Sequence, residues 1–126
     1  KTAGIEAPFS MKGRNLNGLV DGSGRDEWPD DVYIQISESH CGRAVRTRKW
    51  KYSVRAPDAQ RKAGFSDTYV EDFLYDLEKD PHERNNLVSD PKLDKVREEM
   101  KQRLLKHMEH ANEPRAEITS RQQSPA

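Results

Sequence analysis

Residues 43–54 read RAVRTRKWKYSV, with two basic residues, Arg48 and Lys49, near the middle. Before this midpoint Val45 lies two positions from Arg43 and two from Thr47. Beyond it, apolar residues recur at every second position: Trp50, Tyr52 and Val54. This period of two is typical of β-strands, so the stretch predicts an antiparallel hairpin. Arg-Lys is not a preferred two-residue turn, so a longer connecting loop stays open as an alternative.

Strand patterns occur on both sides of this hairpin. Residues 30–37, DDVYIQIS, place three apolar side chains on one face: Val32, Ile34 and Ile36. A polar loop, residues 38–42 (ESHCG), joins this strand to the hairpin. Residues 73–77 repeat the alternation after a polar loop at 56–72. Asp80-Pro81 ends that strand, because proline cannot donate a backbone hydrogen bond. We therefore expect about four strands.

A long helix is predicted after the last strand. Asp90 is a good N-cap and Pro91 suits the first helical position. Apolar residues then recur at spacings of three and four: Leu93, Val96, Met100, Leu104 and Met108. The helix should run over residues 91–110, about 30 Å. Glu99 and Arg103 are spaced for an i,i+4 ion pair.

The pattern as a whole predicts an α+β fold: a small antiparallel sheet with one amphipathic helix packed on it. We expect an irregular connector at 1–29, the folded unit at 30–110 and a flexible tail at 111–126. The helix covers only one face of such a sheet. The aromatic and basic residues of the other face need a cover or mark a docking surface.

Composition narrows the class of protein. The chain has 126 residues, 33% hydrophobic and 35% charged, which is polar for an independent globule. Either its ends are disordered or another part completes its core. Lys plus Arg equals Asp plus Glu at 22 each, which argues against a general nucleic-acid binder. The sequence contains no run of roughly 18 apolar residues and therefore predicts no membrane span. The single cysteine and four histidines make a structural zinc site improbable.

Several segments, in this order, resemble the carboxy-terminal subdomain of the sulfatases, a family of the alkaline phosphatase superfamily. They are TAGI (2–5) with Pro8, MKGRNL (11–16), WPDDVY (28–33), RAVRT with WKY (43–52), and LYDLEKDP with NNL (74–87). The resemblance covers residues 2–110. It is nearest to bacterial-type sulfatases and to the N-sulfoglucosamine sulfohydrolase group.

The resemblance implies a larger enzyme that cleaves sulfate esters or N-sulfates of carbohydrates. Such enzymes have an amino-terminal catalytic domain that binds calcium and carries a formylglycine made from the first residue of a C/S-x-P-x-R motif. Cys41 is followed by GRAV, so it does not match. We assign no catalytic residue and no metal ligand here. We expect this chain to be inactive alone and to support the missing catalytic domain. Relatives are often periplasmic, secreted or lysosomal.

Two residues are candidate substrate contacts. His40 and Arg43 flank the end of the loop before the hairpin, and loops of this subdomain can reach the substrate cleft in the family. A guanidinium binds sulfate or carboxylate oxygens bidentately, so a sulfated glycan is the implied ligand. An ordinary surface loop is the alternative. A stand-alone module that binds a polyanion or a protein partner is a rival function, and a phosphodiesterase or phosphonate hydrolase a lesser one.

Overall fold

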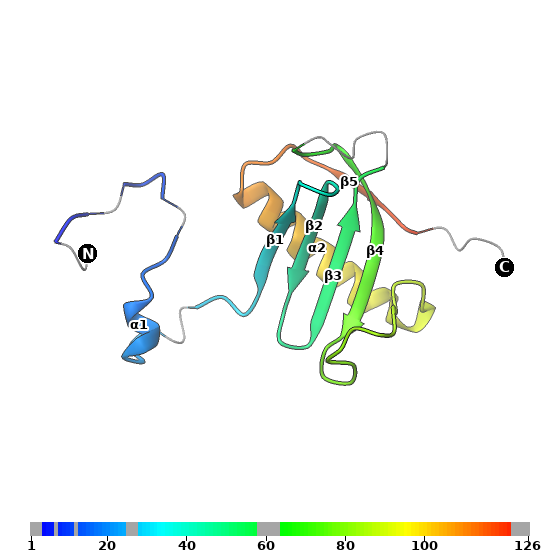
Figure 1. Cartoon of the computed structure of the whole chain (residues 1–126), viewed down its shortest axis with the longest axis horizontal. Coiled ribbons are helices and arrows are strands. Elements are labelled where there is room, and N and C mark those ends of the chain that lie inside the picture. Colours follow the sequence, from blue (N-terminus) through cyan, green and yellow to red (C-terminus); the bar gives the residue numbers. More distant parts are fainter. Residues whose placement is uncertain (1–3, 7, 12, 25–27, 58–63, 122–126) are drawn as a thin grey trace.

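The computed structural model describes residues 4–6, 8–11, 13–24, 28–57 and 64–121. Its elements in chain order are α1 (Asn17–Val20), β1 (Val32–Ile36), β2 (Gly42–Arg46), β3 (Trp50–Arg55), β4 (Thr68–Asp76), the short 3₁₀ helix η3 (Pro91–Leu93), α2 (Asp94–His110) and β5 (Glu117–Thr119) (Figure 1). The α+β prediction is confirmed.

The strands form one sheet in the order β1-β2-β3-β4-β5. β1 to β4 are antiparallel neighbours, and Val45 of β2 lies opposite both Tyr33 and Tyr52. β5 runs parallel to β4 along Thr68–Val70. The sequence predicted about four strands and a flexible tail from residue 111, and the structure adds a short fifth strand within that segment. A strand of three residues is too short to show a period of two.

The hairpin and β4 differ from their predicted bounds. Residues 47–49 form the hairpin connection, so the loop is longer than two residues. The Thr47 hydroxyl accepts from the backbone N–H of Trp50 at 2.9 Å and that of Lys49 at 3.3 Å. β4 begins at Thr68, inside the predicted loop at 56–72, because its early residues pair with β3 beyond an irregularity between Ser53 and Val54.

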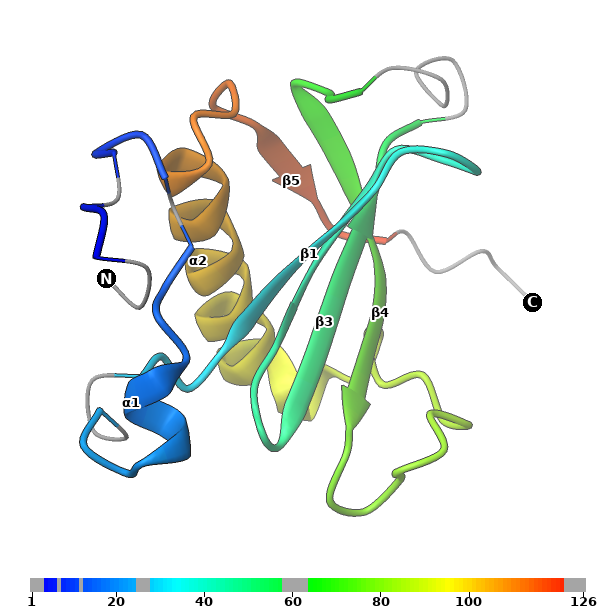
Figure 2. The same cartoon turned by 60° about the vertical axis from the view of Figure 1, so that its left-hand side comes forward.

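The helix starts as the sequence predicts. The Asp90 side chain accepts from the backbone N–H of Lys92 at 2.9 Å, and Pro91 occupies the first position. The first turn is η3, and α2 follows. The ion pair between Glu99 and Arg103 is present at 3.3 Å. α2 lies across one face of the sheet and leaves the other face uncovered (Figure 2).

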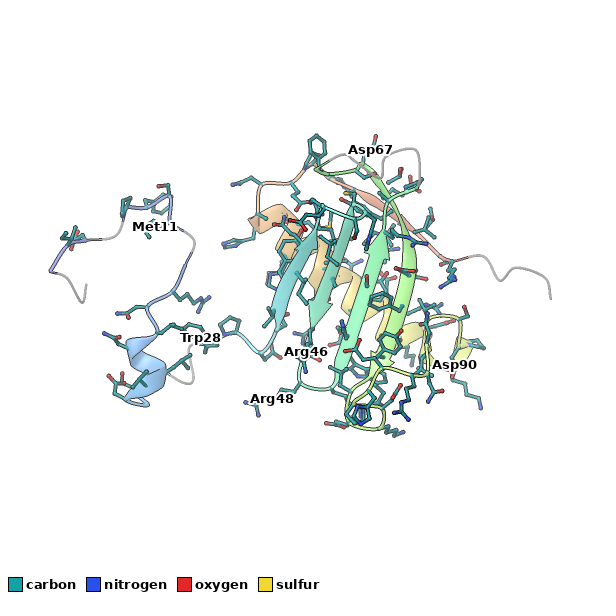
Figure 3. The ribbon with its side chains drawn as sticks, in the orientation of Figure 1. Met11, Trp28, Arg46, Arg48, Asp67 and Asp90 are labelled. Carbon is teal, nitrogen blue, oxygen red and sulfur yellow. The ribbon has the colours of Figure 1, made fainter. Side chains whose placement is uncertain are left out.

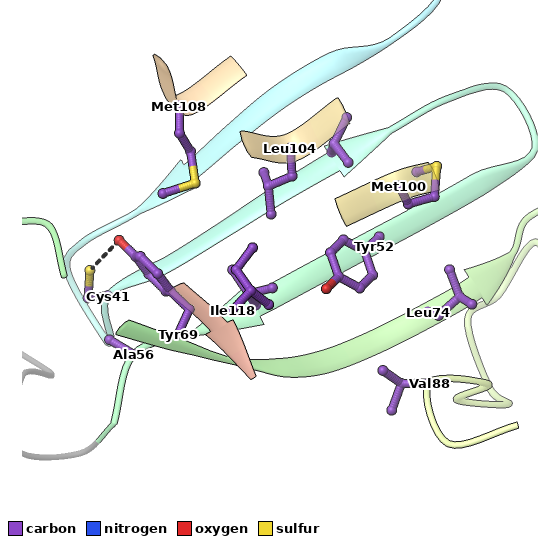
Figure 4. Close-up of a cluster of buried hydrophobic side chains, with 12 residues drawn as sticks. Cys41, Tyr52, Ala56, Tyr69, Leu74, Val88, Met100, Leu104, Met108 and Ile118 are labelled. Carbon is purple, nitrogen blue, oxygen red and sulfur yellow. Dashed lines mark hydrogen bonds between the residues drawn. The ribbon is translucent and has the colours of Figure 1, made fainter. Parts of the chain in front are cut away.

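The core lies between α2 and the sheet (Figure 4). Met100, Leu104 and Met108 face the strands and are at most 2% exposed. Buried strand and loop residues meet them: Cys41, Val45, Tyr52, Val54, Ala56, Tyr69, Leu74, Val88 and Ile118. Burying each large apolar side chain contributes roughly 1.5–3 kcal/mol. In the part of the chain that the structure describes, every buried side-chain nitrogen and oxygen has a hydrogen-bond partner.

The described residues of the connector contribute no buried apolar side chain. Its helix α1 is a single turn with no buried residue. Several of its apolar side chains are largely exposed: Ile5, Phe9, Met11, Leu16 and Val20. Met11 and Trp28 both lie on this segment, to one side of the sheet (Figure 3). Among the described residues, no helix is long and apolar enough to cross a membrane.

Candidate functional site at one end of the sheet

The loop that carries His40 joins β1 to β2 at one end of the sheet. His40 is half-buried, and its Nδ1 lies 3.0 Å from the Ser39 hydroxyl. The ring also packs against Gly42, where a Cβ would lie only 3.0 Å from His40 Nε2. Glycine at this position therefore lets the imidazole lie against the backbone. The half-buried ring is therefore held against the chain at Ser39 and at Gly42.

Arg43 directly follows this loop but is not a free surface residue. It is 2% exposed, and all three guanidinium nitrogens donate to atoms of the chain. Nη1 donates to the carbonyl of Gly42 at 2.8 Å and that of Ile36 at 3.4 Å, and Nη2 to the carbonyl of Gly64 at 2.6 Å. The structure therefore brings His40 and Arg43 together around Gly42, but only His40 remains accessible to a ligand.

The charge of Arg43 is neutralised by Glu113, which lies between α2 and β5. Arg43 Nε donates to both carboxylate oxygens at 2.9 Å. Tyr33 donates its hydroxyl to the same carboxylate at 2.7 Å, and the Gln35 amide also donates to it. Burial lowers the pKa of Arg43, but the hydrogen bond and charge of Glu113 outweigh that effect and raise it. Glu113 is the residue of this site that sequence reasoning missed, since no periodic pattern surrounds it.

Cys41 lies next to this network and shows no sign of a nucleophile. It is fully buried, and its Sγ lies 3.6 Å from the Tyr69 hydroxyl. Burial, followed by the contact with Cys41, raises the pKa of Tyr69 to about 12. A reactive cysteine is usually accessible and close to an unpaired cation, and Cys41 meets neither condition. Within the described residues, no group of three His, Cys, Asp or Glu side chains could hold a metal ion.

The uncovered face of the sheet is the second candidate surface. Phe73 and Tyr75 of β4 are half-buried there, with ring centroids 5.2 Å apart. Lys51 lies above the Phe73 ring, 5.6 Å from its centroid, and forms an ion pair of 2.6 Å with Glu83. Val32, on the edge strand, is 60% exposed. Aromatic and aliphatic groups beside a paired charge are typical of a surface that another protein unit covers.

These features define an α+β subdomain with one sheet face covered by α2 and one that no described helix covers. The chain belongs to the family described as N-sulphoglucosamine sulphohydrolase, C-terminal, whose model matches residues 1–110. The sulfatase resemblance that the sequence motifs indicated is thereby confirmed. The search of curated proteins returned no relative of this chain.

Solved structures give the same result. A protein from Bacteroides thetaiotaomicron assigned to the sulfatases matches 88% of this chain at 27% identity, with a TM-score of 0.66. A 2-O GAG sulfatase matches 87% at 27% identity and a TM-score of 0.65. A protein solved with its substrate D-glucosamine-2-N,6-O-disulfate shares the fold at 21% identity and a TM-score of 0.72. This chain spans only 22–23% of the length of these proteins.

Proposed function

We propose that this chain is the carboxy-terminal part of a hydrolase that cleaves sulfate esters or N-sulfates of carbohydrates. The observation that supports this most strongly is the family match over residues 1–110. Two structural relatives are described as acting on a sulfated sugar or a GAG, which supports the substrate class. The subdomain itself performs no chemical step. Its role is to support a catalytic domain and one side of the substrate cleft.

The uncovered sheet face is the proposed contact with that catalytic domain. Phe73 and Tyr75 would lose their remaining exposure there, and the ion pair of Lys51 with Glu83 would stay at the border. The exposed apolar side chains of the connector, such as Phe9 and Val20, would pack on the same partner. Burying this apolar surface supplies the driving force for docking.

His40 is the proposed substrate contact of this chain. A sulfate or carboxylate oxygen of a glycan would accept a hydrogen bond from the ring in place of its contact with the Ser39 hydroxyl. Arg43 has a different proposed role, because its guanidinium nitrogens already donate to the chain: it holds the loop that presents His40. Calcium and formylglycine do not fit the residues described here. In this proposal they belong to the missing catalytic domain.

Sequencing the DNA upstream of the Lys1 codon is the first test. An open frame that encodes C-x-P-x-R or S-x-P-x-R and metal-binding aspartates would support the proposal. It would also show whether a leader directs the protein to the periplasm, the outside of the cell or the lysosome. A stop codon just upstream would leave a stand-alone module. Heparin affinity and a cooperative melt of this chain alone would then favour the binding module.

In the full-length protein, His40→Ala should raise KM for a sulfated saccharide about tenfold, as expected when one charge-assisted contact is lost. Glu38→Gln is the matched control, because it changes an exposed side chain of the same loop and leaves the contact between Ser39 and the His40 ring in place. An unchanged KM in His40→Ala would refute the substrate contact while leaving the family assignment intact.

A further inference from the structure

The segment after α2, residues 111–121, packs against the sheet. Figure 1 shows it passing the same end of the sheet as the connection between β1 and β2. Residues 111–121 lie outside the family match, which ends at residue 110. Yet Glu113 of this segment is only 10% exposed and accepts from Arg43, Tyr33 and Gln35. Ile118 of the same segment is buried in the core.

Arg43 connects this segment to both ends of the loop that carries His40. Its Nη1 donates to the carbonyls of Ile36 and Gly42, which are the last residue of β1 and the first of β2. One guanidinium nitrogen thus spans the whole loop at 37–41. Its Nη2 donates to Gly64, which belongs to the connection between β3 and β4. A planar, fork-shaped donor group is needed to reach acceptors in several directions, and lysine cannot provide it.

We propose that Glu113 is a positioning residue: through the buried guanidinium of Arg43 it fixes the conformation of the loop at 37–41 and therefore the orientation of His40. The Glu113 carboxylate receives both contacts of Arg43 Nε and thereby sets the rotation of the guanidinium plane. Once that plane is fixed, Nη1 and Nη2 point at the loop carbonyls. The importance of this device for substrate binding rests on the proposed function, but the conformational effect does not.

Hydrogen exchange of this 126-residue chain, followed by mass spectrometry, tests the conformational effect. Glu113→Gln keeps the size of the side chain and removes its charge. We expect backbone amides of residues 37–42 to exchange about tenfold faster while the interior of α2 stays protected, because local opening is independent of global unfolding. Glu109→Gln is the matched control: Glu109 is exposed near the end of α2, and no side-chain contact is described for it.

A second variant separates positioning from charge. Arg43→Lys keeps a cation beside Glu113 but lacks the fork that reaches the three carbonyls. We expect the loop amides to exchange faster in Arg43→Lys as well, and the NMR signals of the His40 ring to shift in both variants. Wild-type exchange at residues 37–42 in Arg43→Lys would overturn the proposal. So would a uniform rise over the whole chain, which would indicate a purely structural ion pair.

The kinetic consequence is measured separately in the full-length protein. Glu113→Gln should raise KM for a sulfated saccharide with a smaller change in kcat. Combining it with His40→Ala should add little, because both changes act through one ring. If exchange and NMR change as expected but KM does not, positioning stands and the proposed substrate contact of His40 fails.

Discussion

The two faces of the sheet are built by the same strands but have different surroundings. On the face covered by α2, Tyr52 is fully buried, and its hydroxyl donates to Glu71 at 3.0 Å. On the other face, the Lys51 side chain is 24% exposed and contacts Phe73 and Glu83. The difference shows that a period of two identifies a strand without saying which face the protein itself covers. Stability is expected to reside in the first face and association with a partner in the second.

The largest expected effect is in the core. Leu104→Ala removes a fully buried side chain between α2 and the sheet and should lower the free energy of unfolding by about 2–5 kcal/mol. Urea unfolding followed by circular dichroism measures the change. Val32→Ala, on the uncovered face, is the matched control and should cost less than about 1 kcal/mol. Equal losses in the two variants would abolish the distinction between the faces.

The buried tyrosines make the covered face sensitive to alkaline pH. Burial raises the pKa of Tyr69 from 10.0 to about 12. Between these values the unfolded state loses the proton and the folded state keeps it, so stability present below pH 10 is lost as the pH rises. Urea midpoints at about pH 9 and about pH 11 should show this decline. Tyr69→Phe should flatten it only in part, since burial also raises the pKa of Tyr52.

Replacing aromatic residues of the uncovered face should have a smaller effect. Phe73→Thr combined with Tyr75→Thr replaces two aromatic residues of β4 with β-branched residues, which also suit a strand, and should cost this chain about 1 kcal/mol or less. In the full-length protein the loss should be larger, because the proposed docking surface is removed. Differential scanning calorimetry of both forms makes the comparison. A large loss in the chain alone would show that this face is already part of a core.

The smallest effect is expected at the hairpin surface. Lys49 and Glu78 are separated by 3.4 Å, with side chains 43% and 62% exposed. Exposed pairs contribute about 0–1 kcal/mol, so Lys49→Gln should hardly change the urea midpoint. Lys51→Gln is the informative partner experiment: both lysines lie over an aromatic ring, Lys49 over Trp50 and Lys51 over Phe73, but Lys51 is the less exposed. A larger fall in the urea midpoint for Lys49→Gln than for Lys51→Gln would show that exposed charges of the hairpin matter more than burial.

Local patterns were sufficient to predict the hairpin, β1 and the long helix. The cap at Asp90 and the spacing of Leu104 and Met108 are local signals, because each involves residues within one or two helical turns of one another. The early part of β4 could not be predicted, because Glu71 resembles a loop residue. It is buried only since Tyr52 donates to it and Arg97 lies 3.6 Å away, and both are far from it in sequence.

The sequence identified the loop of the candidate site but not the contacts of its side chains. The sequence drew attention to His40 and Arg43 through the loop that they flank and through a family resemblance. It could not show that Arg43 is buried, because that depends on Glu113, which is 70 positions away in the chain. Long-range partners of this kind have no local signal.

The two edges of the sheet differ in how much backbone they leave unpaired. β1 and β5 are the two edge strands, but β5 has only three residues and β1 has five. β1 reads VYIQI, without charge or proline, and its first residue is 60% exposed. Natural sheets usually protect such an edge with lysine, proline or a bulge, because bare backbone groups recruit strands from other molecules. Produced without a covering partner at high concentration, this chain should therefore aggregate through β1, and lysine at Ile34 (Ile34→Lys) should keep it monomeric.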